Sequence, residues 1–278
     1  MSPSLPPVRA CLFDMDGLLL NTEDIYTTVT NTILLENGRP PLPWSIKAQL
    51  QGRPGPAASE IFHAWAQLPM DIDAYHARIS ELQRTLFPSA APLPGTADLL
   101  QTLIRASPEN RPDEKIHIAL ATSSHRANFE LKTSHLKEFF AVFPEERVVV
   151  GDDPRVPKGR GKPAPDIYLL ALETINAGLR KEGKEEVRPE ECLVFEDAVP
   201  GVEAGRRAGM RVVWVPQQGL LEEYKERVEE VLAGATGEAD TSKEGHWGEV
   251  GKNGDGMAEL RMSLEGFGYE RYGIVVPN

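Results

Sequence analysis

Residues 8–17 read Val-Arg-Ala-Cys-Leu-Phe-Asp-Met-Asp-Gly, a short apolar run that ends in two aspartates and a glycine. The run over residues 8–13 has the length and composition of a buried strand. Asp14 and Asp16 follow it two positions apart, so in an extended backbone their side chains face the same side. Two close carboxylates repel unless a cation lies between them, and hard divalent ions prefer carboxylate oxygens. The stretch indicates a Mg²⁺ site at a strand end or, taken alone, two solvated loop aspartates with Gly17 making a turn.

Four more apolar runs follow, each bounded by turn signals and separated from the next by stretches with helical periodicity. They cover residues 116–121, 148–150, 193–195 and 212–215. This alternation predicts an α/β fold: a Rossmann-like, doubly wound parallel sheet with helices on both faces. Because the crossovers are right-handed, all strands of such a sheet end at one edge, and ligands bind there.

An insertion of about 80 residues separates the first two runs, far more than an ordinary crossover needs. Segments with helical patterning lie inside it and are broken by Pro40-Pro41-Leu42-Pro43, by Pro54-Gly55-Pro56 and by Pro88; the segments are 22–37, 57–67 and 71–87. We therefore expect a helical cap over residues 22–93, inserted into a catalytic core formed by residues 1–21 and 94–233.

The C-terminal part has a different composition. Residues 234–257 are rich in glycine and polar side chains, which predicts a flexible, solvated insertion without chemistry. A short helix is expected over residues 258–264, before an apolar end at residues 274–276. We expect residues 258–278 to form a tail that packs on the core.

Bulk properties exclude several classes of function. The formal net charge of −12 repels a phosphate backbone, so we expect no nucleic-acid partner. The sequence shows no secretion signal and no apolar run long enough for a membrane span. Cys11 and Cys192 each lie in an apolar run, which indicates buried free thiols rather than a disulfide. A cytoplasmic location is expected, with the nucleus as an alternative.

Three other strand ends carry polar groups. Thr122 and Ser123 follow the second run, where they could hold a phosphate or cap the helix that begins near residue 126. Lys162 stands just before a proline-started helix, and an acidic pair over residues 196–197 ends the fourth run. Each signal alone is typical of capping or solvated residues. Together they bring acid, hydroxyl, base and acid to one edge of the sheet.

In residue type, order and spacing, Asp14-x-Asp16-Gly17, Thr122, Lys162-Pro163 and Glu196-Asp197 resemble the haloacid dehalogenase superfamily of phosphohydrolases. The resemblance covers residues 8–216. It implies a Mg²⁺-dependent phosphoric monoester hydrolase that forms an aspartyl phosphate.

The resemblance also assigns roles to residues. Asp14 would be the nucleophile and a metal ligand. Asp16 would act as general acid and base, with its backbone carbonyl on the metal. Thr122, Ser123 and Lys162 would bind the phosphoryl group. The remaining metal ligands would be Asp197 and, directly or through water, Glu196.

A helical insertion directly after the first strand is similar to the small-cap class of this family, whose caps close over small substrates. Several segments resemble its pseudouridine-5′-phosphatase group: residues 14–23, 68–70, 86–88, 120–124, 132–134, 150–154 and 194–198. The implied substrate is a small phosphorylated metabolite, a nucleotide or sugar phosphate such as pseudouridine 5′-phosphate. Candidate specificity residues on the cap side are Asn21, Glu23 and Arg53. Arg53 is equally typical of an exposed turn, and Asn21 stands where many relatives carry aspartate.

Two other functions remain open. A phosphosugar mutase of the β-phosphoglucomutase type would use the same core but must hold a second phosphate in the cap. This cap lacks a clear basic cluster, and residues 54–56 are Pro-Gly-Pro where such mutases carry an arginine. A non-catalytic member of the fold is disfavoured because every catalytic group is present. We expect a monomer, since a mobile cap needs free surface.

Overall fold

The computed structural model describes residues 5–53, 55–239, 241–242 and 245–277. Pro54, assigned above to a break between cap helices, lies outside the described residues. The same holds for residues 240 and 243–244 of the expected glycine-rich insertion and for the chain ends at residues 1–4 and 278.

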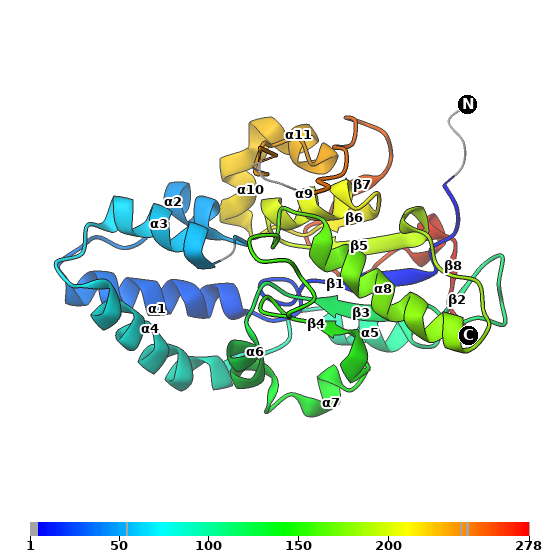
Figure 1. Cartoon of the computed structure of the whole chain (residues 1–278), viewed down its shortest axis with the longest axis horizontal. Coiled ribbons are helices and arrows are strands. Elements are labelled where there is room, and N and C mark those ends of the chain that lie inside the picture. Colours follow the sequence, from blue (N-terminus) through cyan, green and yellow to red (C-terminus); the bar gives the residue numbers. More distant parts are fainter. Residues whose placement is uncertain (1–4, 54, 240, 243–244, 278) are drawn as a thin grey trace.

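A parallel sheet of six strands forms the centre of the molecule (Figure 1). In spatial order the strands are β4 (Val148–Val149), β3 (His117–Ala121), β1 (Ala10–Phe13), β5 (Cys192–Glu196), β6 (Arg211–Trp214) and β7 (Ala258–Leu260). The chain passes from β1 outward through β3 and β4, then returns to the other side of β1 with β5. This switch in direction opens a crevice at the carboxyl end of β1, where Asp14 follows. The structure confirms the α/β, Rossmann-like doubly wound fold with helical cap.

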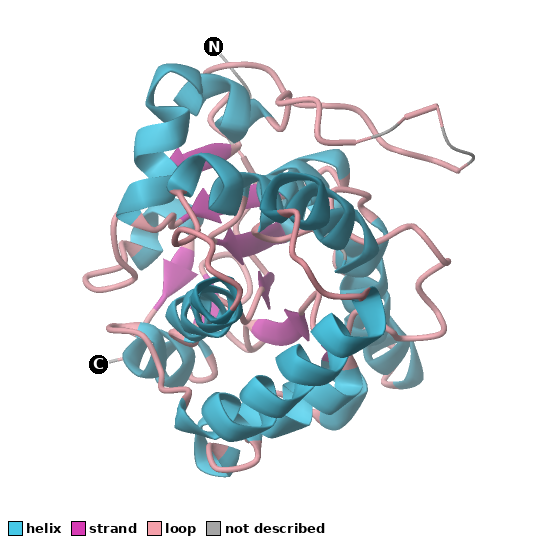
Figure 2. Ribbon diagram, turned by 90° about the vertical axis from the view of Figure 1, so that its left-hand side faces the viewer, coloured by secondary structure: helices cyan, strands magenta, loops and turns pink. Residues whose placement is uncertain are grey.

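Alternate residues of β1 pack into two different cores. Cys11 and Phe13 face one core, and Phe13 stacks on Phe195 with ring centroids 4.7 Å apart. That face is covered by α5 (Thr96–Leu103) and by C-terminal residues such as Phe267. Ala10 and Leu12 face the other core. It is covered by α8 (Asp166–Lys181), α9 (Val199–Arg207), α10 (Gln218–Tyr224) and α11 (Val228–Ala233), so helices flank both faces of the sheet (Figure 2).

The segment between β1 and α5 contains four α-helices that lie to one side of the sheet (Figure 1). They are α1 (Thr22–Glu36), α2 (Trp44–Leu50), α3 (Gly55–Ala66) and α4 (Ile72–Leu86). Helix α2 was not expected, because the prolines at residues 40–43 indicated only a break. Pro43 instead occupies the N-cap of α2, where no backbone N–H is needed from it.

The other elements are short. They comprise α6 (Arg126–Thr133), α7 (Lys137–Phe140), β2 (Ser107–Pro108), β8 (Ile274–Val275) and the 3₁₀ turns η1 (Phe87–Ser89), η2 (Glu145–Arg147), η3 (Pro189–Glu191), η4 (Lys225–Arg227) and η5 (Tyr269–Tyr272). Strands β2 and β8 pair antiparallel and hold the C-terminal segment beside the end of α5. None of the helices within the described part of the chain is long and apolar enough to cross a membrane. Both cysteines are buried free thiols, as expected.

The prediction of a helix over residues 258–264 is wrong. Residues Ala258–Leu260 form β7, which pairs in parallel with β6, and Trp214 lies opposite Leu260. The sequence of this stretch favours a helix locally, but the unpaired edge of β6 offers backbone hydrogen bonds that outweigh that preference. The tail thus adds a strand to the central sheet.

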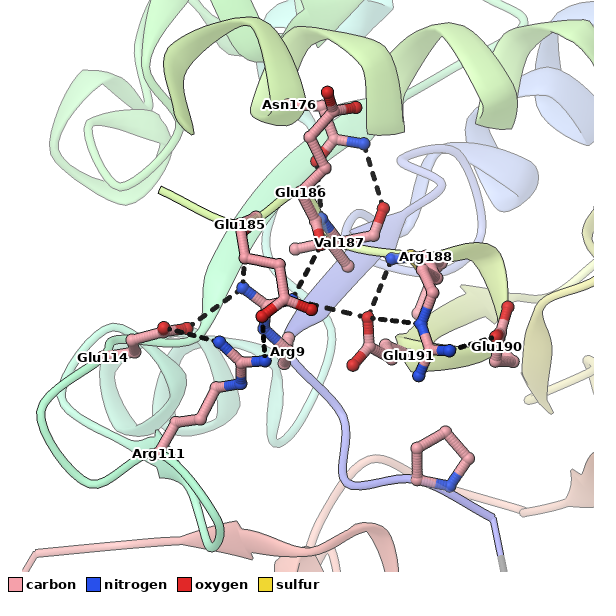
Figure 3. A network of polar contacts seen from close by, with 12 residues as sticks. Arg9, Arg111, Glu114, Asn176, Glu185, Glu186, Val187, Arg188, Glu190 and Glu191 are labelled. Atoms are coloured by element: carbon pink, nitrogen blue, oxygen red, sulfur yellow. Dashed lines mark hydrogen bonds and ion pairs between the residues drawn. The ribbon is translucent and has the colours of Figure 1, made fainter. Parts of the chain in front are cut away.

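A buried ion network lies around Arg9, which directly precedes β1 (Figure 3). The guanidinium of Arg9 is 1 % exposed and donates to the backbone oxygens of Glu185 and Glu186, each at 2.9 Å. It also pairs with Glu114 at 3.1 Å and Glu191 at 3.4 Å. The network ties the loop before β5 to the start of the central strand.

The substitution Arg9→Met should lower the free energy of unfolding by about 3 kcal/mol, because it removes one of the two arginines paired with the buried carboxylate of Glu191 and the donor to the backbone oxygens of Glu185 and Glu186. Urea unfolding followed by circular dichroism measures the change. Arg105→Met, at an exposed position, is the matched control. An Arg9 variant as stable as this control would contradict the role given to the network.

Candidate active site

Three carboxylates gather at the carboxyl edge of the sheet. One oxygen from each of Asp14, Glu196 and Asp197 lies within 4.8 Å of the others, and all three residues are buried. We call these residues the acidic centre. Lys162 lies against it, with its Nζ 2.5 Å from Asp14 Oδ1 and 2.6 Å from Glu196 Oε1. Residues from the ends of β1 and β5 thus meet the loop before α8.

Two glycines make room for the acidic centre. Gly17 has φ +81°, and a Cβ there would lie 2.1 Å from Asp197 Oδ2. A Cβ at Gly201, in the first turn of α9, would lie 1.8 Å from Glu196 Oε1. Larger residues at either position would displace a carboxylate, so the glycines that follow each acidic motif are needed for its geometry.

The buried carboxylates of the acidic centre repel one another, and Lys162 offsets only part of this repulsion. Burial raises the pKa of Asp14 to about 8, and the like charges of Glu196 and Asp16 add to a shift that Lys162 only partly offsets. Burial likewise raises the pKa of Asp197 well above its usual value, with Glu196 and Asp14 as further causes. Lys162 is the nearest compensating charge: although burial favours its neutral form, Asp14 and Glu196 raise its pKa. Three carboxylates beside one lysine leave an excess of negative charge. This excess suits a divalent ion that prefers oxygen ligands.

The side chain of Asp16 is held by its own set of polar groups, apart from the acidic centre. Its Oδ1 accepts hydrogen bonds from Lys132 Nζ at 2.5 Å and Thr22 Oγ1 at 2.6 Å. Its Oδ2 accepts one from Ser124 Oγ at 2.7 Å. Burial alone would raise the pKa of Asp16, but Lys132 and the two hydroxyls hold it below its usual value. Asp16 is therefore kept ionised.

The sequence analysis did not predict Lys132 as a residue of this site. It is fully buried in α6, and its Nζ lies 4.5 Å and 4.6 Å from the ring centroids of Tyr26 and Phe87. A lone lysine on a helix usually reaches solvent, so its residue type gives no signal. The position of Lys132 in the helix does indicate burial, because it lies three residues after Phe129, on the face that turns inward.

The two residues whose hydroxyls were expected to bind phosphate lie in different places. Ser123 lines the main cavity. Thr122 is fully buried and donates to Asp16 Oδ2 at 3.3 Å, and its Oγ1 accepts from the backbone N–H of Ser124. Ser124, the next residue of the same strand end, also lines the cavity.

A cavity of about 660 Å³ opens between the acidic centre and the cap helices. Gln51, just after α2, lines the cavity: its Nε2 donates to Asp197 Oδ2 at 2.6 Å, while the buried Oε1 has no partner among the described residues. The next residue, Gly52, has φ +74°, and a Cβ there would lie 2.5 Å from the Cβ of Ala198. The cap backbone therefore touches the core directly beside the acidic motif.

The three candidate specificity residues have different surroundings. Glu23 lines the cavity and lies 3.7 Å from Lys47 Nζ. Arg53 also lines the cavity and forms an ion pair with Glu238. Asn21 lies at the junction of cap and core, where its Oδ1 accepts from the backbone N–H of Ala91 at 2.8 Å. The Asn21 side chain thus links the segment that leads from β1 into the cap to the segment that leads from the cap to α5.

The chain belongs to the haloacid dehalogenase-like hydrolases, whose family model matches residues 8–209. It is 46% identical over 209 residues to the "Probable pseudouridine-5'-phosphatase" of Saccharomyces cerevisiae, covering 75% of this chain and 83% of the relative. It is 36% identical over 224 residues to the mitochondrial (DL)-glycerol-3-phosphatase 1 of Arabidopsis thaliana, covering 80% of this chain and 68% of the relative.

Among solved structures, the chain resembles CbbY from Rhodobacter sphaeroides in complex with phosphate. The TM-score is 0.56 and the identity 25%, over 76% of this chain and 88% of CbbY. These findings confirm the resemblance stated from the sequence motifs. The protein is an enzyme, a phosphatase of the haloacid dehalogenase family.

Proposed function

We propose that the protein is a Mg²⁺-dependent phosphomonoester hydrolase that forms an aspartyl phosphate on Asp14. The observation that carries this proposal is the position of Lys162, which bridges Asp14 and Glu196 at the floor of the cavity. A carboxylate beside a fixed ammonium group, at the base of a pocket that admits a small molecule, suits attack on a phosphoryl group.

In the proposed first step, an oxygen of Asp14 forms a bond to phosphorus, and the bond from phosphorus to the leaving oxygen breaks. For this step Asp16 must carry a proton, which the negative charge of a bound phosphate favours. Asp16 gives that proton to the leaving oxygen, so the alcohol departs neutral, and the proton taken from water in the second step restores it. In the second step Asp16 takes a proton from water, which attacks the phosphorus and releases phosphate from Asp14. The low pKa of Asp16 suits the second step, where the ionised carboxylate acts as base. Lys162 stays beside Asp14 throughout and offsets charge on the phosphoryl oxygens.

The acidic centre fits a Mg²⁺ ion because its donors are all carboxylate oxygens. Asp14 and Asp197 would hold the ion, with Glu196 directly or through water and the backbone carbonyl of Asp16 as further ligands. Bound there, Mg²⁺ would offset the negative charge of the carboxylates and of the substrate phosphate.

The cavity favours a substrate about the size of a nucleotide. Its volume of about 660 Å³ is within the range for small-molecule sites. Away from the acidic centre it is lined by Phe62 and Tyr75, whose rings stack with centroids 5.4 Å apart, and by Tyr26. An aromatic wall suits a planar base, so we propose a nucleotide or sugar phosphate such as pseudouridine 5′-phosphate.

A phosphosugar mutase is the second candidate, but it needs free cations in the cap for a second phosphate. The cap cations in the described cavity wall, Lys47 and Arg53, are already paired with Glu23 and Glu238. Hydrolysis is therefore preferred. Rapid interconversion of a sugar 1-phosphate and 6-phosphate without net phosphate release would overturn this preference.

A panel of phosphomonoesters tests the proposed function. With Mg²⁺, purified protein should release phosphate from at least one member of a panel that includes pseudouridine 5′-phosphate and glycerol 3-phosphate. Release should stop with excess EDTA and return when Mg²⁺ is restored. No release from any member, or release unaffected by EDTA, would contradict the proposal.

A further inference from the structure

Every permanent cation in the described part of the cavity wall already has an acidic partner. The wall contains Lys47, Arg53 and Lys162. Lys162 is held by the acidic centre and Lys47 lies beside Glu23. The partner of Arg53, by contrast, comes from far along the chain: Glu238, in the glycine-rich segment over residues 234–257.

The ion pair between Arg53 and Glu238 is well sheltered. The two side chains are 22% and 11% exposed. Arg53 Nε also donates to the backbone oxygen of Gln49 at 2.5 Å, so the guanidinium keeps one anchor that does not depend on Glu238. On the other side, Tyr224 OH lies 3.4 Å from Glu238 Oε1. The carboxylate thus has a defined place beside the cavity wall.

A buried carboxylate in the core fixes the backbone around Glu238. Glu203, on α9, is fully buried and pairs with Arg207 at 2.9 Å. It accepts hydrogen bonds from the backbone N–H groups of Glu238 at 3.0 Å and Ala239 at 3.1 Å, and from Thr236 Oγ1 at 3.1 Å. Charge-assisted bonds to backbone donors are strong, so α9 positions this part of the segment rather than leaving it to solvent.

We propose that Glu238 neutralises Arg53 and so makes the cavity reject substrates that carry a second phosphate. A free guanidinium in the cavity wall would bind a phosphate through two parallel hydrogen bonds. With Glu238 in place, a second phosphate meets a carboxylate of the same sign, which costs binding energy. The preferred substrate is then a monophosphate with an uncharged organic part. This inference rests on the proposed function and narrows its substrate class.

The substitution Glu238→Gln tests the inference, with Glu249→Gln, at an exposed position of the same segment, as the matched control. The probes are ribulose 5-phosphate and ribulose 1,5-bisphosphate, which differ by one phosphate. Each is titrated as an inhibitor of the fastest reaction found in the phosphomonoester panel, so binding is seen whether or not the probe is hydrolysed. In Glu238→Gln the inhibition constant of the bisphosphate, relative to that of the monophosphate, should fall by about tenfold. It should stay at the wild-type ratio in Glu249→Gln.

A double variant shows whether Arg53 receives the second phosphate. In Glu238→Gln with Arg53→Gln the ratio should return to the wild-type value. An unchanged ratio in Glu238→Gln, or an equal fall in the double variant, would overturn the inference and leave the phosphatase proposal intact. A wild-type protein that binds the bisphosphate more tightly than the monophosphate would also overturn it. If the wild type hydrolyses no panel member, the proposed function fails first and the inference fails with it.

Discussion

Asp14→Asn should abolish phosphate release while leaving the protein folded. An amide cannot form the covalent bond to phosphorus, so kcat should fall by on the order of 10⁴-fold or more. Lys162 can still donate to the Asn oxygen, as it now does to Asp14 Oδ1 at 2.5 Å. The measurement is phosphate release in the presence of Mg²⁺, with the best substrate of the panel.

The stability of this variant follows from the pKa of Asp14. The pKa of Asp14 is raised to about 8 in the folded protein, so folding favours the neutral carboxyl. The free energy of unfolding therefore falls as the pH rises from the pKa of the unfolded chain toward the pKa of the folded protein. An uncharged amide removes this cost. In EDTA at pH 7, Asp14→Asn should therefore unfold at the same or a higher temperature than the wild type. Asp98→Asn, at an exposed position, controls for the chemical change, and retention of more than a tenth of the activity in Asp14→Asn would refute Asp14 as nucleophile.

Five strands of the central sheet could be predicted because each is a local apolar run. The run over residues 116–121 became β3 (His117–Ala121), and the run over residues 193–195 became β5 (Cys192–Glu196). The acidic and basic motifs could be located for the same reason, since each directly follows a strand or precedes a helix. Parallel topology then brings such residues together without any knowledge of side-chain contacts.

The features that sequence could not reveal depend on partners far along the chain. Residues 258–260 became a strand because the edge of β6 was free, although the stretch itself favours a helix. Gln51 contacts Asp197 across 146 positions, and Arg53 pairs with Glu238 across 185. No local pattern marks such contacts, because both partners are residues that most often face solvent.

Lys132→Met should impair both stability and catalysis, because Lys132 holds Asp16 from a fully buried position. Methionine matches the length of the side chain and suits the neighbouring rings of Tyr26 and Phe87, so the main loss is electrostatic. The carboxylate of Asp16 then keeps only hydroxyl partners, and the free energy of unfolding should fall by about 3 kcal/mol. Urea unfolding measures this loss, and Lys137→Met, at an exposed position of α7, is the control.

The same variant separates a positioning role from a purely structural one. Lys132 helps to hold the pKa of Asp16 below its usual value against the effect of burial. Without Lys132 that pKa rises, so Asp16 becomes an ionised base only at higher pH, and the acidic limb of the kcat profile should move toward higher pH. At pH 7 kcat should fall by on the order of 10²-fold. An unmoved acidic limb would contradict the positioning role.

Adding Asp16→Asn to Lys132→Met tests the electrostatic origin of the lost stability. The double variant carries no charge at either position, so the buried carboxylate that lost its cation is gone. Its free energy of unfolding should recover to within about 1 kcal/mol of the wild type, whereas activity should stay low because the acid–base group is missing. A double variant as unstable as Lys132→Met alone would mean that Lys132 stabilises the fold by packing. Recovery of stability would instead show that the charge on Lys132 stabilises the fold by balancing the buried carboxylate of Asp16.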